Sequence, residues 1–179
     1  FTAWDTRLQL EQCVLSNTQG EDGANFVRCS VDLNNCHFQG MPSDGLDLDY
    51  CRGRLLHCSF QDTGNDGLDV SGSLLEIRIS RFSGHGDKGI SVGEQSDLAL
   101  FDISIKNSKT GIAVKDRSTT IVDKIQLEEC PLGMAVFQKK GLFGGAHLVV
   151  KKLEATAVRQ LYHIDPNSSL ELEGSLLNE

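Results

Sequence analysis

Aspartates recur in pairs 22 residues apart in this sequence. Asp44 is matched by Asp66, and Asp47 is matched by Asp69. If the chain returns to the same place after 22 residues, the members of each pair lie side by side on one surface. Neighbouring carboxylates repel one another unless a cation or a basic group screens them, and closely spaced oxygen ligands suit calcium. Asp47 and Asp69 are therefore candidate ligands of a calcium ion.

A structural role explains the same four residues. Asp44 and Asp66 each stand directly before a glycine, where an aspartate side chain commonly accepts a hydrogen bond from the backbone of its own turn. Asp47 and Asp69 would then be solvated surface groups. The sequence leaves both interpretations open.

Charged residues continue this surface beyond the aspartates. Together with Asp44, Asp47 and Asp69, the candidate ligand-binding residues are Asp87, Lys88, Glu94, Lys115 and Asp116. Ordinary ion pairing is the alternative, because Lys88 lies one period after Asp66 and Lys115 is expected beside Glu94, where solvated pairs form for a small gain.

A catalytic interpretation of this surface uses Lys88. A lyase acting on an acidic glycan needs a basic group to remove a proton, and Lys88 could take that role. Repeats of constant length leave no room for long loops that wall a cleft, so binding is favoured over catalysis.

The elements that must position these residues repeat with the same period. The series of glycines is Gly23, Gly45, Gly67, Gly89, Gly111 and Gly133, and its next two positions are Ala155 and Leu177. Apolar residues one and three places after each glycine alternate with a polar or small residue, as in a strand. A fixed repeat of this length indicates a solenoid, whose units stack because none can bury its apolar face alone.

Stacking the repeats predicts inward ladders on three short strands per coil. The first strand supplies one ladder of Ala24, Leu46, Leu68, Ile90, Ile112 and Met134 and another of Phe26, Leu48, Val70, Val92, Val114 and Val136. The second strand supplies Phe38, Phe60, Phe82, Ile105, Leu127 and Val149, and the third supplies Leu33, Leu55, Ile77, Leu100 and Val122. Between the first two ladders runs an outward stripe of Asn25, Asp47, Asp69, Ser91, Ala113 and Ala135.

These ladders predict an all-β fold, a single-stranded parallel β-helix of about eight coils of 22–23 residues. We expect residues 1–179 to form one domain. Phe1 is not an initiator and no signal peptide is visible, so the chain is expected to be a fragment of a longer protein. Strand edges left open at both ends of a solenoid predict neighbouring domains or self-association as partners.

Composition narrows the classes of function. The formal net charge of −8 argues against nucleic acid, because affinity for phosphate comes mostly from Lys and Arg. No apolar run approaches the length of a membrane span. The basic residues are unevenly distributed, since the six within residues 1–86 are all arginine and nine of the ten within residues 87–155 are lysine.

Five of the six cysteines follow the period. Cys36 and Cys58 are 22 residues apart, as are Cys29 and Cys51, and Cys13 precedes Cys36 by 23. Cys36 shares a strand face with Phe38, so the thiols are expected to point inward as free, buried groups. Disulfides in a secreted protein are the alternative, although stacked parallel side chains do not readily adopt the torsion that a disulfide needs.

Two segments resemble repeats of the pectate-lyase-like β-helix superfamily, in its carbohydrate-binding and sugar-hydrolase subgroup. They are Asp-Gly-Leu-Asp-Val at 66–70 and Gly-Asp-Lys-Gly-Ile-Ser-Val-Gly-Glu at 86–94. With residues 111–116, Lys139-Lys140 and Phe-Gly-Gly at 143–145, the similarity extends to the β-helix region of bacterial proteins that carry a spore-coat-type kinase module. The resemblance implies a right-handed β-helix that binds glycans outside the cell or at its surface, with a ligand-free structural spacer as the alternative.

Gly84-His85-Gly86 is also similar to a polygalacturonase motif. The resemblance implies that Asp66 and Asp69 are the catalytic acid and base of an inverting hydrolase, which needs two carboxyl groups with room for a water molecule between them, and that His85 positions the substrate. Asn65-Asp66 lacks the intervening residue of that family's Asn-x-Asp, and Arg78-Ile79 precedes the histidine instead of following it. A polysaccharide hydrolase or lyase is therefore retained only as a further alternative.

Overall fold

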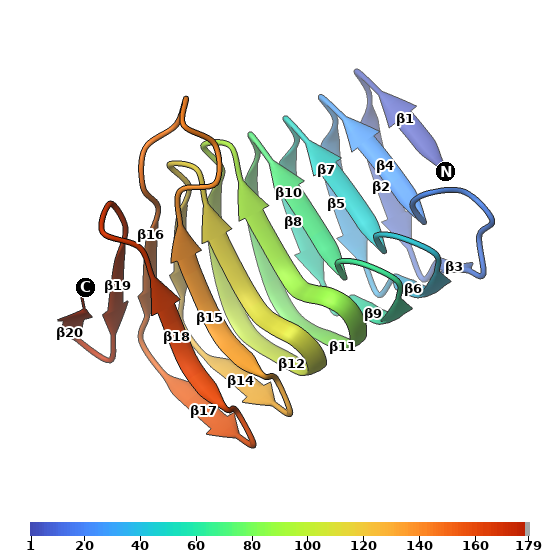
Figure 1. Ribbon diagram of the computed structural model, residues 1–179. Coiled ribbons are helices and arrows are strands. Elements are labelled where there is room, and N and C mark those ends of the chain that lie inside the picture. Colours follow the sequence, from blue (N-terminus) through green and yellow to red (C-terminus); the bar gives the residue numbers. More distant parts are fainter. Residues whose placement is uncertain (178–179) are drawn as a thin grey trace.

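The computed structural model describes residues 1–177, which wind into a rod built from strands (Figure 1). None of the described segments is a helix long and apolar enough to span a membrane. Each turn of the chain lays one strand on each of three faces, and the strands pair in parallel with the equivalent strands of neighbouring coils, except for one antiparallel pair near the C-terminal end. The predicted parallel β-helix is confirmed.

Face A carries the outward stripe. Its strands are β1 (Thr2–Trp4), β4 (Ala24–Val27), β7 (Leu46–Asp49), β10 (Leu68–Ser71), the C-terminal parts of β11 (Leu74–Gly93) and β12 (Asp97–Lys115), β15 (Leu132–Phe137) and β18 (Gln160–Ile164). Figure 1 shows this face toward the viewer.

Faces B and C complete the triangular section. Face B contains β2 (Arg7–Glu11), β5 (Ser30–Asn34), β8 (Arg52–Leu56), the N-terminal parts of β11 and β12, β13 (Thr119–Val122), β16 (His147–Val150) and β19 (Ser169–Leu172), which pairs antiparallel with β20 (Ser175–Leu177). Face C contains β3 (Val14–Ser16), β6 (His37–Met41), β9 (Ser59–Thr63), the middle parts of β11 and β12, β14 (Ile125–Glu128) and β17 (Leu153–Thr156).

Two strands are longer than the predicted short ones. β11 spans 20 residues and β12 spans 19, because the ladder between these two coils continues around the corners with one irregularity, between His85 and Lys88. The prediction of three short strands per coil therefore holds for the other coils.

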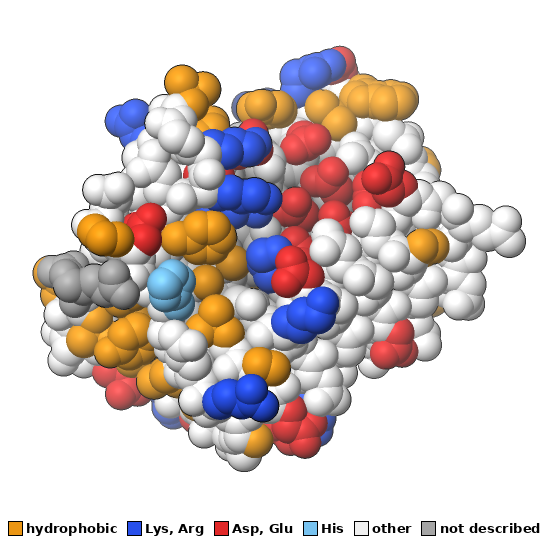
Figure 2. Space-filling view, viewed as in Figure 1, with side chains coloured by type: hydrophobic (Ala, Val, Ile, Leu, Met, Phe, Trp, Pro, Cys, Tyr) orange, Lys and Arg blue, Asp and Glu red, His pale blue; other side chains and the backbone are white. Residues whose placement is uncertain are grey.

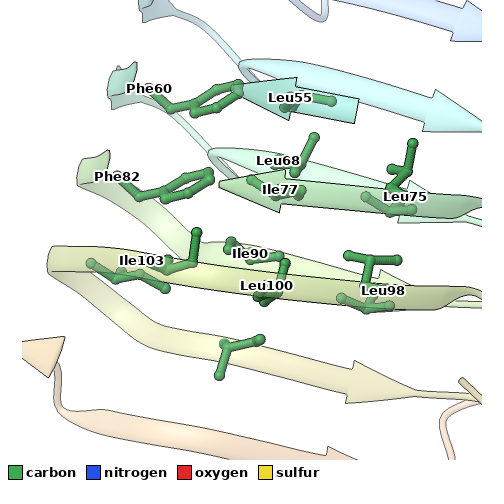
Figure 3. Close-up of a cluster of buried hydrophobic side chains, with 14 of the residues drawn as sticks. Leu55, Phe60, Leu68, Leu75, Ile77, Phe82, Ile90, Leu98, Leu100 and Ile103 are labelled. Atoms are coloured by element: carbon green, nitrogen blue, oxygen red, sulfur yellow. The ribbon is translucent and has the colours of Figure 1, made fainter. Parts of the chain in front are cut away.

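The core consists of the predicted inward ladders. Both ladders of face A are fully buried from Ala24 to Val136, and so is the face B ladder from Leu33 to Val122. On face C the rings of Phe38, Phe60 and Phe82 stack at centroid distances of 4.9 and 4.7 Å. Figure 3 shows such ladders, in which each side chain lies over its equivalent in the next coil. Burial of this continuous apolar column stabilises the rod.

Close approach of neighbouring coils explains the glycine series. A Cβ added to Gly45 would lie 2.5 Å from the carbonyl oxygen of Gly67, and one on Gly67 would lie 2.7 Å from that of Gly89. Any side chain would force the coils apart, so glycine is required wherever another coil stacks. Gly133 stacks beneath Leu161, and within residues 1–177 no strand pairs with β18 on its other side. Leucine is therefore tolerated there.

The prediction of coils of constant length is wrong after Gly133. Thr119 pairs with His147 and Leu127 pairs with Ala155, each 28 residues later, because a loop at 138–146 adds six residues between β15 and β16. Figure 1 shows this loop standing out between the two strands. Val149 consequently pairs with Ile121 on face B instead of continuing the Leu127 ladder. Ala155 and Leu177 likewise lie outside the glycine series.

The cysteines are free, as predicted. Cys29, Cys36, Cys51, Cys58 and Cys130 are buried. The backbone N–H of Cys29 donates to Sγ of Cys51 at 3.4 Å, and that of Cys51 donates to Oγ of Ser73 at 2.7 Å. Burial raises the pKa of Cys51 and of Cys58 to about 11, so these thiols are inert parts of the core.

A candidate ligand-binding surface on face A

The outward stripe of face A is a continuous ladder. The backbone register joins Asn25, Asp47, Asp69, Ser91, Ala113, Ala135 and His163 in that order. Figure 2 shows acidic side chains gathered over the N-terminal strands of this face, with basic side chains beside them toward the middle. Along the rod, the surface around this stripe therefore changes from an acidic region to a basic region and then to the alanines.

Asp44 and Asp66 serve the backbone, although not in the way predicted. Oδ1 of Asp44 accepts the N–H of Asp66 at 2.7 Å, and Oδ1 of Asp66 accepts the N–H of Lys88 at 2.9 Å. Each carboxylate thus caps the turn of the following coil and not its own. Burial raises the pKa of Asp44 to about 6 and is also the main reason why the pKa of Asp66 is raised.

Asp47 and Asp69 lie side by side, half-buried, on the acidic part of the stripe. Oδ2 of Asp47 accepts a hydrogen bond from Nδ2 of Asn25 at 2.7 Å. Burial, followed by repulsion from Asp49 and Asp69, raises the pKa of Asp47 to about 7. Within residues 1–177 no three acidic, His or Cys side chains converge to hold a metal ion. The geometry therefore gives the calcium hypothesis no support.

Two lysines form the basic region, of which Lys88 is half-buried and Lys115 is buried. Nζ of Lys88 lies 3.4 Å from Oδ1 of Asp66 and also contacts Asp87. Burial alone would lower the pKa of Lys88, but these two carboxylates raise it overall. Nζ of Lys115 donates to Oγ of Ser91 at 2.7 Å and lies 3.8 Å from Asp69. The expected pair of Lys88 and Asp66 is therefore present.

Glu94 pairs with the inserted loop instead of with Lys115. Its carboxylate contacts Nζ of Lys140. Asp116 holds the same loop, because its Oδ1 accepts the N–H groups of Lys139 and Lys140 at 2.7 and 2.6 Å. Asp116 is fully buried. The expectation that it contacts a ligand on face A is therefore wrong.

His85 points into the rod. Its Nδ1 lies 2.7 Å from Oγ1 of Thr63, its ring lies edge-on to Phe82 at 6.2 Å, and only 4% of the residue is exposed. Burial lowers its pKa to about 4. Asp69 lies on the outward stripe, so the two residues do not form a shared catalytic site.

A hollow of about 440 Å³ follows the basic region. We call it the alanine hollow, and it is lined by Lys88, Thr110, Ala113, Leu132, Ala135, Phe137, Gln138, His163 and Asp165. Small side chains in the stripe leave it open, whereas Phe137 and Gln138 lead into the inserted loop. The backbone N–H of Gln138 donates to Oδ2 of Asp165 at 2.7 Å, which fixes the start of the loop against β18.

Most lining residues of the alanine hollow were missed from the sequence. Phe137, Gln138, His163 and Asp165 come together only through the 28-residue coil, which the regular period concealed. The signal available was the pair of alanines at successive positions of the stripe, because two adjacent small residues on the outward side of a strand ladder predict a depression. Both alanines are buried at its bottom.

Comparison with known proteins agrees with the fold. Residues 21–144 match the family model for the right-handed beta helix region. This chain belongs to the right-handed β-helix family. Among solved structures, the β-helix chain is similar to the crystal structure of the enzymatically active domain of tailspike protein 2 of bacteriophage CBA120, with a TM-score of 0.65 and 12% identity. The match covers 92% of this β-helix chain and 28% of the tailspike chain, and at this identity it shows the fold alone.

The β-helix chain spans about 28% of the length of that tailspike chain. Among curated proteins, none matches it.

Proposed function

We propose that this chain is a glycan-binding β-helix module of a larger secreted or cell-surface protein, with face A as the binding surface. The observation that carries the proposal is the alanine hollow, which adjoins a row of acidic and basic side chains. The resemblance to β-helix regions that accompany spore-coat-type kinase modules supports a place within a longer bacterial protein.

The lining of the alanine hollow suits a sugar ring. Binding sites for small polar ligands combine apolar walls with a few placed polar groups. Leu132, Ala135 and Phe137 offer an apolar surface for the C–H face of a ring, and aromatic rings such as that of Phe137 present a flat face for such contact. Lys88 and Asp165 offer hydrogen-bonding groups for hydroxyls at its edge.

The acidic region can extend the site along the rod. Asp47 and Asp69 are half-buried, and Asp87 and Lys88 border them. The raised pKa of Asp47, about 7, leaves part of this group protonated near neutral pH, where a carboxyl can both donate to and accept from sugar hydroxyls. A chain of several sugars lying across the coils would contact both regions.

Binding is favoured over catalysis by the state of the candidate groups. His85 is buried, and the raised pKa of Lys88 makes it a poor proton acceptor near neutral pH. The tailspike relative in fold is described as an enzymatically active domain, so activity is tested directly. The chain is incubated with polygalacturonate and with alginate, and we expect neither new reducing ends nor the absorbance of an unsaturated product.

A glycan array, probed with and without calcium, tests the proposal. We expect Phe137→Ala to weaken binding of the recognised glycan by about tenfold, as for the loss of a buried aromatic contact. Phe101→Ala is the matched control, because Phe101 is an outward-facing aromatic on face B that lies against Arg78.

Three outcomes would contradict the proposal. Absence of binding to every glycan would favour the ligand-free spacer. If Phe137→Ala and Phe101→Ala weaken glycan binding equally, the binding site does not lie on face A. Retention of full affinity by a double variant, Asp47→Ala with Asp69→Ala, would exclude the acidic region from it.

A further inference from the structure

A larger hollow lies on face B near the N-terminal end of the rod. Its volume is about 1010 Å³, and its lining includes Arg7, Ser30, Tyr50, Arg52, Gly53 and Arg54. We call it the arginine groove. It crosses β2, β5 and β8, which lie behind the strands of face A in Figure 1. It shares no lining residue with the alanine hollow.

Small residues open this groove. The register places Arg7, Ser30 and Arg52 at equivalent outward positions of three successive coils, so a short side chain lies between two long ones. Gly53 follows in β8 with a φ of +144°, and a Cβ there would lie 1.8 Å from the carbonyl oxygen of Val31. Only glycine fits this close backbone approach, so the inward position between Val31 and Leu75 carries no side chain in this coil.

The arginines of the groove fall into two groups. Arg28 forms a bidentate ion pair with Asp5 at 2.7 Å, and Arg54 forms a bidentate ion pair with Asp32 at 2.9 Å. Within the described residues Arg7 makes no side-chain hydrogen bond or ion pair. The same is true of Arg52. Two coil spacings, about 9.6 Å, separate their backbones.

Uncompensated guanidinium groups in a concave site attract anions. Their planar fork matches the two oxygens of a carboxylate or a sulfate, which makes arginine more selective for such groups than lysine. All six basic residues of the first 86 are arginine, and the arginine groove gathers four of them. A repeating anion along a chain would meet Arg7 and Arg52 in turn.

The rest of the lining suits sugar rings. Tyr50 is 60% exposed, and its ring is packed over Gly72, where a Cβ would lie 2.6 Å from it. An adjoining hollow of about 670 Å³ continues toward the exposed side chains of Leu74 and Ile121. The residues that it shares with the groove are Ser30, Arg52, Gly53 and Glu76. The combined depression runs along the rod, with a charged part and an apolar part.

We propose that the arginine groove binds an anionic polysaccharide, through the carboxylates or sulfates on its sugars. This site is separate from face A and does not rest on the function proposed there. Nucleic acid fits less well, because Asp5, Asp32 and Glu76 also line the groove. They can accept hydrogen bonds from sugar hydroxyls, which a polysaccharide carries along its whole length and a DNA duplex does not.

Calorimetric titration of the whole chain with three probes tests the proposal. Polygalacturonate supplies carboxylates, dextran sulfate supplies sulfates, and unsubstituted dextran supplies neither. We expect one of the two anionic polymers to bind, with an affinity that falls as salt is added, and we expect dextran not to bind. The stronger of the two anionic polymers identifies which group is recognised.

Variants locate the site. Arg7→Ala and Arg52→Ala are each expected to weaken binding about tenfold, the effect of losing one charge-assisted contact. Arg52→Lys should also weaken it, because the charge remains but the fork is lost. Arg81→Ala is the matched control, since Arg81 is an exposed arginine of β11 on face C that should leave affinity unchanged.

Several results would overturn the proposal. These are no binding of either anionic polymer, equal losses in Arg81→Ala and Arg52→Ala, or equally tight binding of a DNA duplex. Phe137→Ala should leave this affinity intact, so failure of the face A site and failure of the arginine groove are distinguishable. Arg7 and Arg52 are exposed, and unchanged unfolding midpoints of their variants will show that the fold is retained.

Discussion

Asp47 illustrates the electrostatic cost of an exact repeat. Residues 22 apart are placed about one strand spacing from each other, so acidic groups that recur with the period repel one another. Burial, Asp49 and Asp69 raise the pKa of Asp47 to about 7, well above the ordinary value of 3.8. The charged form is therefore penalised in the folded state. The stability that depends on a neutral Asp47 is complete below pH 3.8 and is lost as the pH rises through about 7.

The stability that depends on His85 changes with pH in the opposite direction. Burial lowers its pKa from 6.5 to about 4, so the stability that depends on neutral His85 is present above pH 6.5 and is lost as the pH falls through about 4. Well above pH 6.5 His85 is neutral in both states and adds no slope.

Asp47→Asn is predicted to stabilise the folded chain at about pH 8, with the gain shrinking as the pH falls toward about 5. The amide keeps an oxygen that can accept the hydrogen bond from Asn25 but carries no charge. Urea denaturation across this pH range measures the effect. Asp97→Asn is the control, because Asp97 is exposed on face B and makes no ion pair within residues 1–177. An equal gain in both variants would refute the explanation.

At the scale of elements, the inserted loop between β15 and β16 shapes the alanine hollow. Asp116 lies at the corner after β12, where the chain has a positive φ of 57°. Its carboxylate accepts two backbone N–H groups from the loop, and the N–H of Arg117 donates to the carbonyl of Gly144 at 3.0 Å. A corner of one coil thus holds the extra residues of the next.

Asp116→Ala is predicted to release this loop without unfolding the rod. Loss of two hydrogen bonds to a carboxylate, at about 1.5–3 kcal/mol each, should cost about 3–6 kcal/mol locally. Hydrogen exchange followed by mass spectrometry should show faster exchange at Lys139 and Lys140 and unchanged protection in β5. Asp123→Ala, at an exposed carboxylate paired with Lys151, should leave the loop protected. Unchanged exchange at Lys139 would show that other contacts hold the loop.

The sequence predicted the elements wherever one physical constraint repeats. Inward positions such as Leu68 must be apolar and glycines such as Gly67 must lack a side chain in every stacked coil, so both were recognised. The inserted loop was missed because Ala155 happens to fall on the 22-residue series, although no glycine is needed there. The alanine hollow depends on the register between coils. The arginine groove depends on that register and also on a single residue, Gly53, whose conformation has no counterpart in the other repeats.

At the scale of the whole molecule, the rod is a one-dimensional stack in which each coil contacts only its neighbours. β1, β2 and β3 pair only with β4, β5 and β6 among the described residues. Their outer edges therefore present unpaired backbone groups, which readily pair with another chain. Near the other end, the antiparallel β20 covers β19, so the two ends differ.

The 179-residue chain is predicted to self-associate through the edge of β1–β3 when no other domain covers it. Trp4 and Val14 are 60% and 66% exposed on this first coil, and apolar side chains beside an open edge favour association. The double variant Trp4→Lys with Val14→Lys places charges there without touching the core, so it should be monomeric at protein concentrations at which the unmodified chain forms larger species in sedimentation velocity. Leu142→Lys is the control, because Leu142 is 91% exposed at the tip of the inserted loop, far along the rod from β1. If the unmodified chain stays monomeric, or if Leu142→Lys abolishes association as fully as the double variant, the edge of β1–β3 is not the contact.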